Sequence, residues 1–247
     1  MKRLIRTELL KQRTTPVFLL AFAAVPVLAL LVTVAVYGAA GNQGNPALGT
    51  DSLVQALGAP ASVVTTLALL LGVVGMGGEY RHQTITTTLL MAPRRRDVVV
   101  AKLAAFALMG AAMALVTTAV AAAVAVPWLH SAGVPVHFGA DALRVSVGLL
   151  LSTALYAALG VAVASLLRNQ TAAVSVVLVW ILTAERLLGN VLGGASVVDW
   201  LPARLASALV QLGPGARPTV AVALGLAAWV GAFAAIGTRF VVRRDVT

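Results

Sequence analysis

The sequence contains no cysteine and few charged residues. Without cysteine, the chain offers no disulfide, no thiolate nucleophile and no cysteine ligand for zinc or an iron–sulfur cluster. Lys, Arg, Asp and Glu make up 11% of the 247 residues, less than half of the ~25% found in soluble domains. The hydrophobic fraction is 60% and the mean hydropathy is +0.96. So few charges cannot cover a surface that faces water, which excludes a soluble globular domain, a disordered chain and a coiled coil. The composition indicates a membrane protein.

Six apolar segments are long enough to cross a bilayer, because a ~30 Å hydrocarbon core needs about 20 helical residues. Helices are predicted over residues 16–38, 59–78, 98–126, 143–167, 171–188 and 218–238. The first apolar run exceeds the 7–15 residues typical of a cleaved signal peptide, so it is predicted to be retained as a spanning helix. The predicted fold is therefore an all-α membrane protein with six transmembrane helices, forming a single domain over residues 1–247.

Basic residues are concentrated on one side of the predicted helices. Of the 18 Lys and Arg residues, 14 lie at the amino terminus, between helices two and three, between helices four and five, or after helix six. The eight acidic residues divide evenly between the two sides. Because cytoplasmic loops carry an excess of Lys and Arg, both termini are predicted to be cytoplasmic, in a bacterial cell membrane. The net charge of +10 then lies entirely on the cytoplasmic side, and no nucleic-acid partner is needed to explain it.

Three segments outside the spans have recognisable patterns. Residues 1–15 are basic and carry Leu4, Ile5 and Leu9 on one helical arc that Glu8 interrupts, which predicts an interfacial helix against anionic lipid. Residues 39–57 are rich in Gly, Asn and Pro and are predicted to form an irregular external loop. Residues 189–217 are predicted to form an external hairpin of one or two short helices, since glycine pairs bracket an apolar stripe at helical spacing.

The connection between helices two and three is unusually long. Polarity begins abruptly at Glu79, and about twenty residues follow before the third helix, where a simple helix–helix turn needs two to eight. Residues 84–91 are too apolar for a simple loop, and a proline with three arginines follows them. This pattern favours a short helix along the cytoplasmic surface. A solvated loop whose arginines bind anionic lipid, at about 1 kcal/mol each, is the alternative.

An ordered set of residues here resembles the signature of permeases of the ABC type-2 exporter family. The set consists of Glu79, Tyr80, Arg81, Thr84, Ile85, Leu89, Leu90, Pro93, Arg95 and Lys102. In that family a Glu-aromatic-Arg group closes the second helix, a proline–arginine turn follows, and a lysine opens the third helix. The six spans and the short external helices before the sixth also agree. His82 and Gln83 depart from the pattern, because the family often places a small residue or glycine there.

The resemblance implies a permease that is driven by a separate ABC ATPase subunit. Residues 79–97 would contain a coupling helix that docks on this partner. The residues to which the resemblance gives this coupling role are Glu79, Tyr80, Arg81, Thr84, Pro93, Arg94, Arg95, Arg96 and Lys102. ATP and Mg would bind to the partner, and the sequence agrees, since it contains no Gly-x-x-x-x-Gly-Lys-Ser/Thr phosphate loop.

The resemblance also implies the assembly and the cargo. Six helices would form half of a twelve-helix pathway, paired with a second copy or a related permease and with two ATPase copies. The cargo would be a drug, a lipid or a lipid-like natural product, moved outward.

Motifs of membrane enzymes are absent from the sequence. It contains neither His-Glu-x-x-His nor Gly-x-Ser-x-Gly, so neither a zinc protease nor a serine hydrolase is predicted. His130, His137 and Asp141 share one external segment, but zinc sites typically use three or four protein ligands. We therefore predict no metal site and no catalytic residue in this chain.

Two alternatives to an ATP-driven exporter remain open. The main one is an ion-coupled secondary transporter, and the other is a membrane scaffold that transports nothing. Secondary carriers keep ionisable residues at mid-membrane, where each costs at least ~2.5–3.5 kcal/mol and usually marks function. The middles of predicted helices one to four and six contain none. Glu185 and Arg186 lie at the outer end of helix five, where they either line an outer gate or mark the membrane interface.

Overall fold

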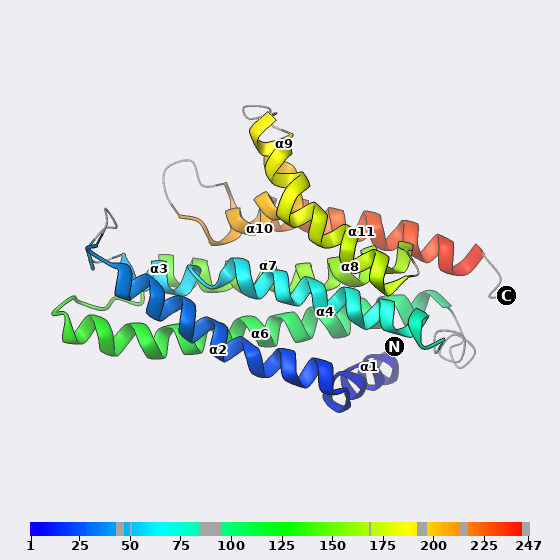
Figure 1. The fold of residues 1–247 in the computed structure, drawn as a ribbon, viewed down its shortest axis with the longest axis horizontal. Coiled ribbons are helices and arrows are strands. Elements are labelled where there is room, and N and C mark those ends of the chain that lie inside the picture. Colours follow the sequence, from blue (N-terminus) through cyan, green and yellow to red (C-terminus); the bar gives the residue numbers. More distant parts are fainter. Residues whose placement is uncertain are drawn as a thin grey trace.

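The fold is that of a computed structural model, in which long helices lie side by side in an elongated bundle (Figure 1). The structure describes residues 1–42, 47–49, 51–83, 95–167, 169–191, 197–212 and 217–243, with the side chains of residues 95, 186 and 240–243 excepted. Every regular element within these ranges is a helix. The amino-terminal helix α1 (Lys2–Thr14) and the end of the last helix, α11 (Thr219–Arg243), lie at the same end of the bundle (Figure 1).

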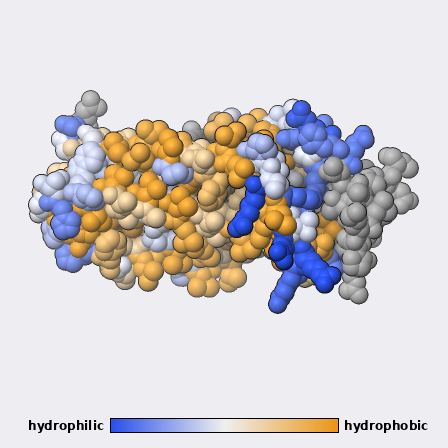
Figure 2. Space-filling model, turned by 90° about the horizontal axis from the view of Figure 1, so that it is seen from below, coloured by the Kyte–Doolittle hydropathy of each residue, from blue (hydrophilic) through white to orange (hydrophobic). Residues whose placement is uncertain are grey.

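Six helical stretches of the described chain are long and apolar enough to span a membrane. They are Pro16–Ala39, Ser52–Arg81, Arg96–Ser131, Ala140–Leu167, Gln170–Val191 and Thr219–Arg239. Each coincides with one of the six predicted runs, so the prediction of six transmembrane helices is confirmed. Figure 2 shows the corresponding surface, a broad apolar band between two hydrophilic ends.

Three helices form the centre of the bundle. They are α4 (Ala61–Arg81), α6 (Arg95–Ser131) and α7 (Ala140–Leu167). In their spanning stretches, 56%, 56% and 67% of the residues are buried, whereas the other three spans bury only 17–22%. The outer spans are α2 (Pro16–Ala39), α11, and a chain of α8 (Gln170–Val179), a π-helical turn (Trp180–Ala184) and α9 (Glu185–Val191). These outer helices therefore present most of their apolar surface to lipid or to another subunit.

Glycines allow α4 and α7 to pack with their backbones in contact. A Cβ added at Gly72 would lie 2.1 Å from the carbonyl oxygen of Ala157, and one added at Gly160 would lie 2.1 Å from that of Leu69. Small residues at such crossings let helices approach closely. Gly160 and the nearby Ala164 are both buried inside this chain.

The structure corrects two predicted boundaries. The second span continues through Gly77 and Gly78 to Arg81, beyond the predicted end of its apolar run. The predicted irregular loop 39–57 contains a helix, α3 (Ser52–Gly58), at its end. The apolar side chains on the inner face of this helix are buried, and Ser52 Oγ accepts a hydrogen bond from the Gly49 N–H at 2.8 Å, which ties the preceding turn to the helix.

The segment before the last span contains two short helices, as the apolar stripe predicts. They are a 3₁₀ turn (Val198–Trp200) and α10 (Pro202–Val210). Leu205 and Leu209 are fully buried, whereas Trp200 is half exposed. The Trp229 indole N–H of α11 donates to the Trp200 carbonyl oxygen at 2.8 Å, which ties the hairpin to the last span.

Candidate functional site

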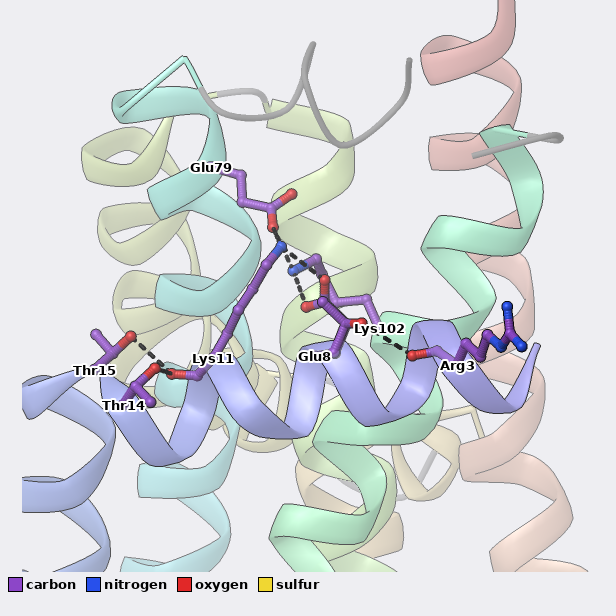
Figure 3. Close-up of polar contacts among 8 residues, drawn as sticks. Arg3, Glu8, Lys11, Thr14, Thr15, Glu79 and Lys102 are labelled. Atoms are coloured by element: carbon purple, nitrogen blue, oxygen red, sulfur yellow. Dashed lines mark hydrogen bonds and ion pairs between the residues drawn. The ribbon is translucent and has the colours of Figure 1, made fainter. Parts of the chain in front are cut away.

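Four charged side chains from three helices meet at the end of the bundle where α1 lies (Figure 3). Glu79 comes from the last turns of α4, Lys102 from the start of α6, and Glu8 with Lys11 from α1. Lys102 Nζ lies 2.5 Å from Glu8 Oε2 and 2.9 Å from Glu79 Oε1. Lys11 Nζ lies 2.9 Å from Glu8 Oε1 and 2.8 Å from Glu79 Oε1. Each lysine therefore bridges both glutamates, and the charges of this four-residue cluster cancel.

Most of the cluster is shielded from water. The side chains of Lys102, Glu8 and Glu79 are 2%, 6% and 8% exposed, while that of Lys11 is 41% exposed. Burial lets charges interact strongly, but it also removes their hydration, so such groups are tolerated only when paired. The cluster satisfies this condition, although Glu79 Oε2 accepts no hydrogen bond from any described residue.

The pKa of Lys11 reflects this balance. Burial on its own would lower the pKa of the ammonium group, because it disfavours the charged form. The hydrogen bonds and negative charges of Glu79 and Glu8 outweigh burial and raise the pKa above its ordinary value of 10.5. Lys11 is therefore charged throughout the physiological pH range.

Aromatic packing supports the cluster from the membrane side. Lys102 Nζ lies 6.0 Å from the centre of the Phe106 ring, one helical turn further along α6, which is within reach of a cation–π contact. Phe106 packs edge-on against Phe18 of α2, with ring centres 5.6 Å apart. Gly75 leaves room for this ring, since a Cβ there would lie 1.9 Å from it. Gly77 is similarly close to Gln170, so the end of the second span packs tightly at Gly75 and Gly77.

Of the predicted coupling residues, the structure brings Glu79 and Lys102 together. Tyr80 is partly buried and packs against the main core, while Arg81 and Arg96 are exposed. Arg95 begins α6, but its side chain is outside the description. Three predicted coupling residues, and with them the predicted coupling helix itself, lie outside the described residues: Thr84, Pro93 and Arg94.

The departure at Gln83 has a structural consequence. Gln83 has a φ of 55°, in the left-handed region where glycine is favoured, and its N–H donates to the Tyr80 carbonyl oxygen at 3.3 Å. α4 ends at Arg81, with His82 as its C-cap, directly before this backbone conformation. A glycine, which the resembling family often has here, would adopt it with less strain because it has no Cβ.

Glu185, for which the sequence left an outer gate and a marker of the membrane interface as alternatives, is a buried capping group. Its side chain accepts hydrogen bonds from the backbone N–H groups of Ala203, at 2.7 Å, and Arg204, at 3.3 Å, through Oε1. These donors belong to the first turn of α10, so Glu185 satisfies two of the N–H groups that a helix start leaves free. With 4% exposure it does not lie free at the membrane surface. The Arg186 side chain lies outside the described part of the chain.

The comparison with protein-family models identifies the chain. A model described as "ABC-2 family transporter protein" matches residues 4–202, which include α1, the four-residue cluster and the first five spans. The chain belongs to the ABC-2 transporter family. A comparison with curated proteins gives no match. Family membership and the six spans make the chain a multi-pass membrane permease of an ABC transporter rather than an enzyme, and imply an ABC ATPase as its partner.

The sequence did not reveal two of the four cluster residues of this permease. Glu8 interrupts the apolar arc of residues 1–15, and the arc was assigned to the lipid surface. In the structure that arc faces the protein, with Glu8 and Gln12 as its most buried members. A carboxylate on the apolar arc of a basic helix, with a lysine three residues later, was the available signal.

Proposed function

We propose that this ABC-2 permease is the membrane half of an ATP-driven exporter of amphiphiles. It works as one of two permease copies, or with a related permease, and with two ATPase subunits. It lies in a bacterial cell membrane with both termini in the cytoplasm, and ATP with Mg is bound by the partner. The four-residue cluster passes movement from the ATPase to the spanning helices.

The observation that carries the proposal is the position of the cluster. Residues 84–94 connect α4 to α6, and the cluster residues Glu79 and Lys102 stand on either side of this connection. They are paired with each other at 2.9 Å and with α1 through Glu8 and Lys11. A partner that moves the connection therefore displaces α4, α6 and α1 together. Removing one member of such a buried group would cost about 3–5 kcal/mol, which indicates how firmly the helices are joined.

The distribution of charge supports an amphiphilic cargo over an ion. Glu79 and Lys102 are neutralised within the cluster, at one end of their spans. A proton or sodium relay needs ionisable groups spaced through the membrane. The middle portions of five spans have none in the sequence. An apolar route instead suits a substrate that already partitions into lipid.

The test is to separate ATP hydrolysis from transport in the reconstituted complex. The permease is co-purified with its ATPase and placed in vesicles, and the transport of a fluorescent amphiphile per ATP hydrolysed is measured. Lys102→Met keeps the length of the side chain but removes the buried cation, which leaves Glu8 and Glu79 with only the partly exposed Lys11 as a shared partner. We expect transport per ATP to fall at least tenfold while the ATPase still binds. Unchanged coupling would overturn the role of the cluster.

Two controls make this result specific. The double variant Glu79→Gln with Lys102→Gln keeps the cluster neutral and leaves the Glu8–Lys11 pair, so it should fold well yet remain uncoupled. Asp199→Asn removes the exposed Asp199–Arg217 ion pair, 2.6 Å long, far from the connection, and should leave coupling unchanged. Ionophores that collapse all gradients should not affect transport. Transport that stops with the ionophore and ignores ATP would instead favour a secondary carrier.

A further inference from the structure

Two adjoining cavities lie at the outer half of the permease and differ in character. The larger, about 890 Å³, is lined by α3, α4, the π-helical turn, α9 and α10, and several polar side chains face it, among them Thr65, Thr66 and Glu185. The smaller, about 300 Å³, is lined almost entirely by apolar and aromatic side chains of α4, α7, α8, the π-helical turn and α11. Tyr156 and Ile181 line both cavities, so the polar space adjoins the apolar one at these two side chains. Both volumes fall in the range of small-molecule sites.

Glu185 has an unused acceptor beside the polar cavity. Its Oε1 caps α10, but its Oε2 is buried and accepts no hydrogen bond from any described residue. The indole N–H of Trp180 and the guanidinium of Arg204 lie close enough to interact with the carboxylate, but neither is within hydrogen-bonding distance of Oε2. A buried carboxylate oxygen without a donor is unfavourable unless a donor is supplied. The cavity is the space from which a ligand can supply one.

The π-helical turn contributes side chains to both cavities. Inserting this turn at Trp180–Ala184 places Trp180 and Ile181 on the apolar cavity and Glu185, at the start of α9, on the polar one. Such turns inside α-helices occur frequently at functional sites. Trp229 and Phe233 of α11 stack with ring centres 5.7 Å apart and line the apolar cavity.

We propose that the two cavities bind one amphiphile whose head is a primary or secondary ammonium group. The ammonium donates a hydrogen bond to Glu185 Oε2, and the tail passes Tyr156 and Ile181 to lie between Trp180 and Trp229. An N–H donor is required, because a quaternary ammonium carries charge but cannot satisfy the oxygen. Arg204 is exposed at the edge of the cavity, where water screens its repulsion of the cation. As a statement about cargo, this proposal rests on the proposed export function.

Tryptophan fluorescence of the full-length chain in a non-ionic detergent tests the proposal. The probe is a twelve-carbon amine brominated at the end of its tail, since bromine quenches nearby indoles. Matched probes carry the same tail with a trimethylammonium or a sulfate head. We expect saturable quenching by the primary amine, with at least tenfold higher affinity than for either matched probe. Trp229→Phe should reduce the extent of quenching and so locate the tail.

Two variants make the assignment falsifiable. Glu185→Gln should weaken binding of the amine about tenfold while leaving the trimethylammonium probe unaffected. Val163→Phe fills the apolar cavity without touching the cap of α10, and should abolish quenching even if Glu185→Gln fails to fold. Equal affinities for the three heads, or an unchanged affinity in Glu185→Gln, would overturn the proposal and leave Glu185 as a helix cap.

This binding assay needs neither ATP nor the ATPase. Selective binding without ATP-driven transport would leave the site standing and refute the export function. ATP-driven transport that shows no preference for the ammonium head would support the export function and refute the proposed ammonium site.

Discussion

At the scale of residues, the permease contains buried charged side chains at positions where an unpaired charge would destabilise the fold. Lys102 is 2% exposed and Glu79 8%, and neither would be tolerated alone so close to the membrane. Their pairing with Glu8 and Lys11 turns four costly groups into a neutral unit. The arginines that surround the connection are different in kind, because Arg81 and Arg96 are exposed and their interactions are weakened by water.

The pH dependence of α1 docking tests the ionisation of Lys11. Because its pKa in the folded protein is raised above 10.5, its contribution is fully present below the unfolded value of ~10.4 and is lost only as the pH rises through the folded value. Spin labels at Thr7→Cys and Arg96→Cys, both exposed positions in a chain without cysteine, report the distance between α1 and α6. We expect an unchanged, narrow distance distribution from pH 6 to 9 and broadening only above about pH 10.5.

Lys11→Met provides the control for this measurement. It should broaden the distribution already at neutral pH and weaken the alkaline transition. Broadening of the unsubstituted protein between pH 6 and 9 would contradict the raised pKa.

At the scale of elements, the contact between α4 and α7 depends on two glycines. Gly160 and Gly72 each face a backbone carbonyl of the other helix, so there is no flexible side chain that can move aside. Gly160→Ala should therefore force the helices apart and destabilise the permease by about 1–3 kcal/mol, the usual cost of overpacking. The midpoint of thermal unfolding of the purified protein measures this effect.

Gly231→Ala is the matched control for the helix-packing prediction. Gly231 lies in α11 with no atom within 4 Å of an added Cβ, and it is exposed. Alanine there should leave the unfolding midpoint unchanged or raise it slightly, because alanine has the higher helix propensity. If both variants lowered the midpoint equally, the loss would not come from the α4–α7 contact.

At the scale of the whole molecule, the arrangement of spans predicts which ends face the cytoplasm. Figure 2 shows strongly hydrophilic residues at both ends of the apolar band, and the basic excess of the sequence assigns the α1 end to the inside. Thr7 in α1 and Ser131 at the end of α6 are exposed, and six spans with both termini on one side put them on opposite faces. An impermeant maleimide should label Ser131→Cys in intact cells, and Thr7→Cys only after permeabilisation. The opposite pattern would invert the topology.

Hydropathy in the sequence was sufficient to predict the six spans, because a bilayer acts on each segment separately. A run of about 20 apolar residues spans the membrane whatever lies beside it, and basic residues stay on the cytoplasmic side. Hydropathy marked Glu79 as the point where polarity begins, whereas attention to Lys102 came from the resemblance to the signature of the ABC type-2 exporter family. Local patterns also predicted the short helices before the last span.

Tertiary structure alone decided which groups meet. Glu8 and Lys102 are 94 positions apart, and their contact exists only because α1 packs on α6 rather than lying free on lipid. Likewise, Glu185 is buried because α10 folds back over the π-helical turn, and Gly160 is needed because α4 crosses α7 there. Hydropathy measures how strongly each residue prefers lipid to water. An apolar arc has the same hydropathy whether it faces lipid or protein. Only the packing of distant helices distinguishes the two.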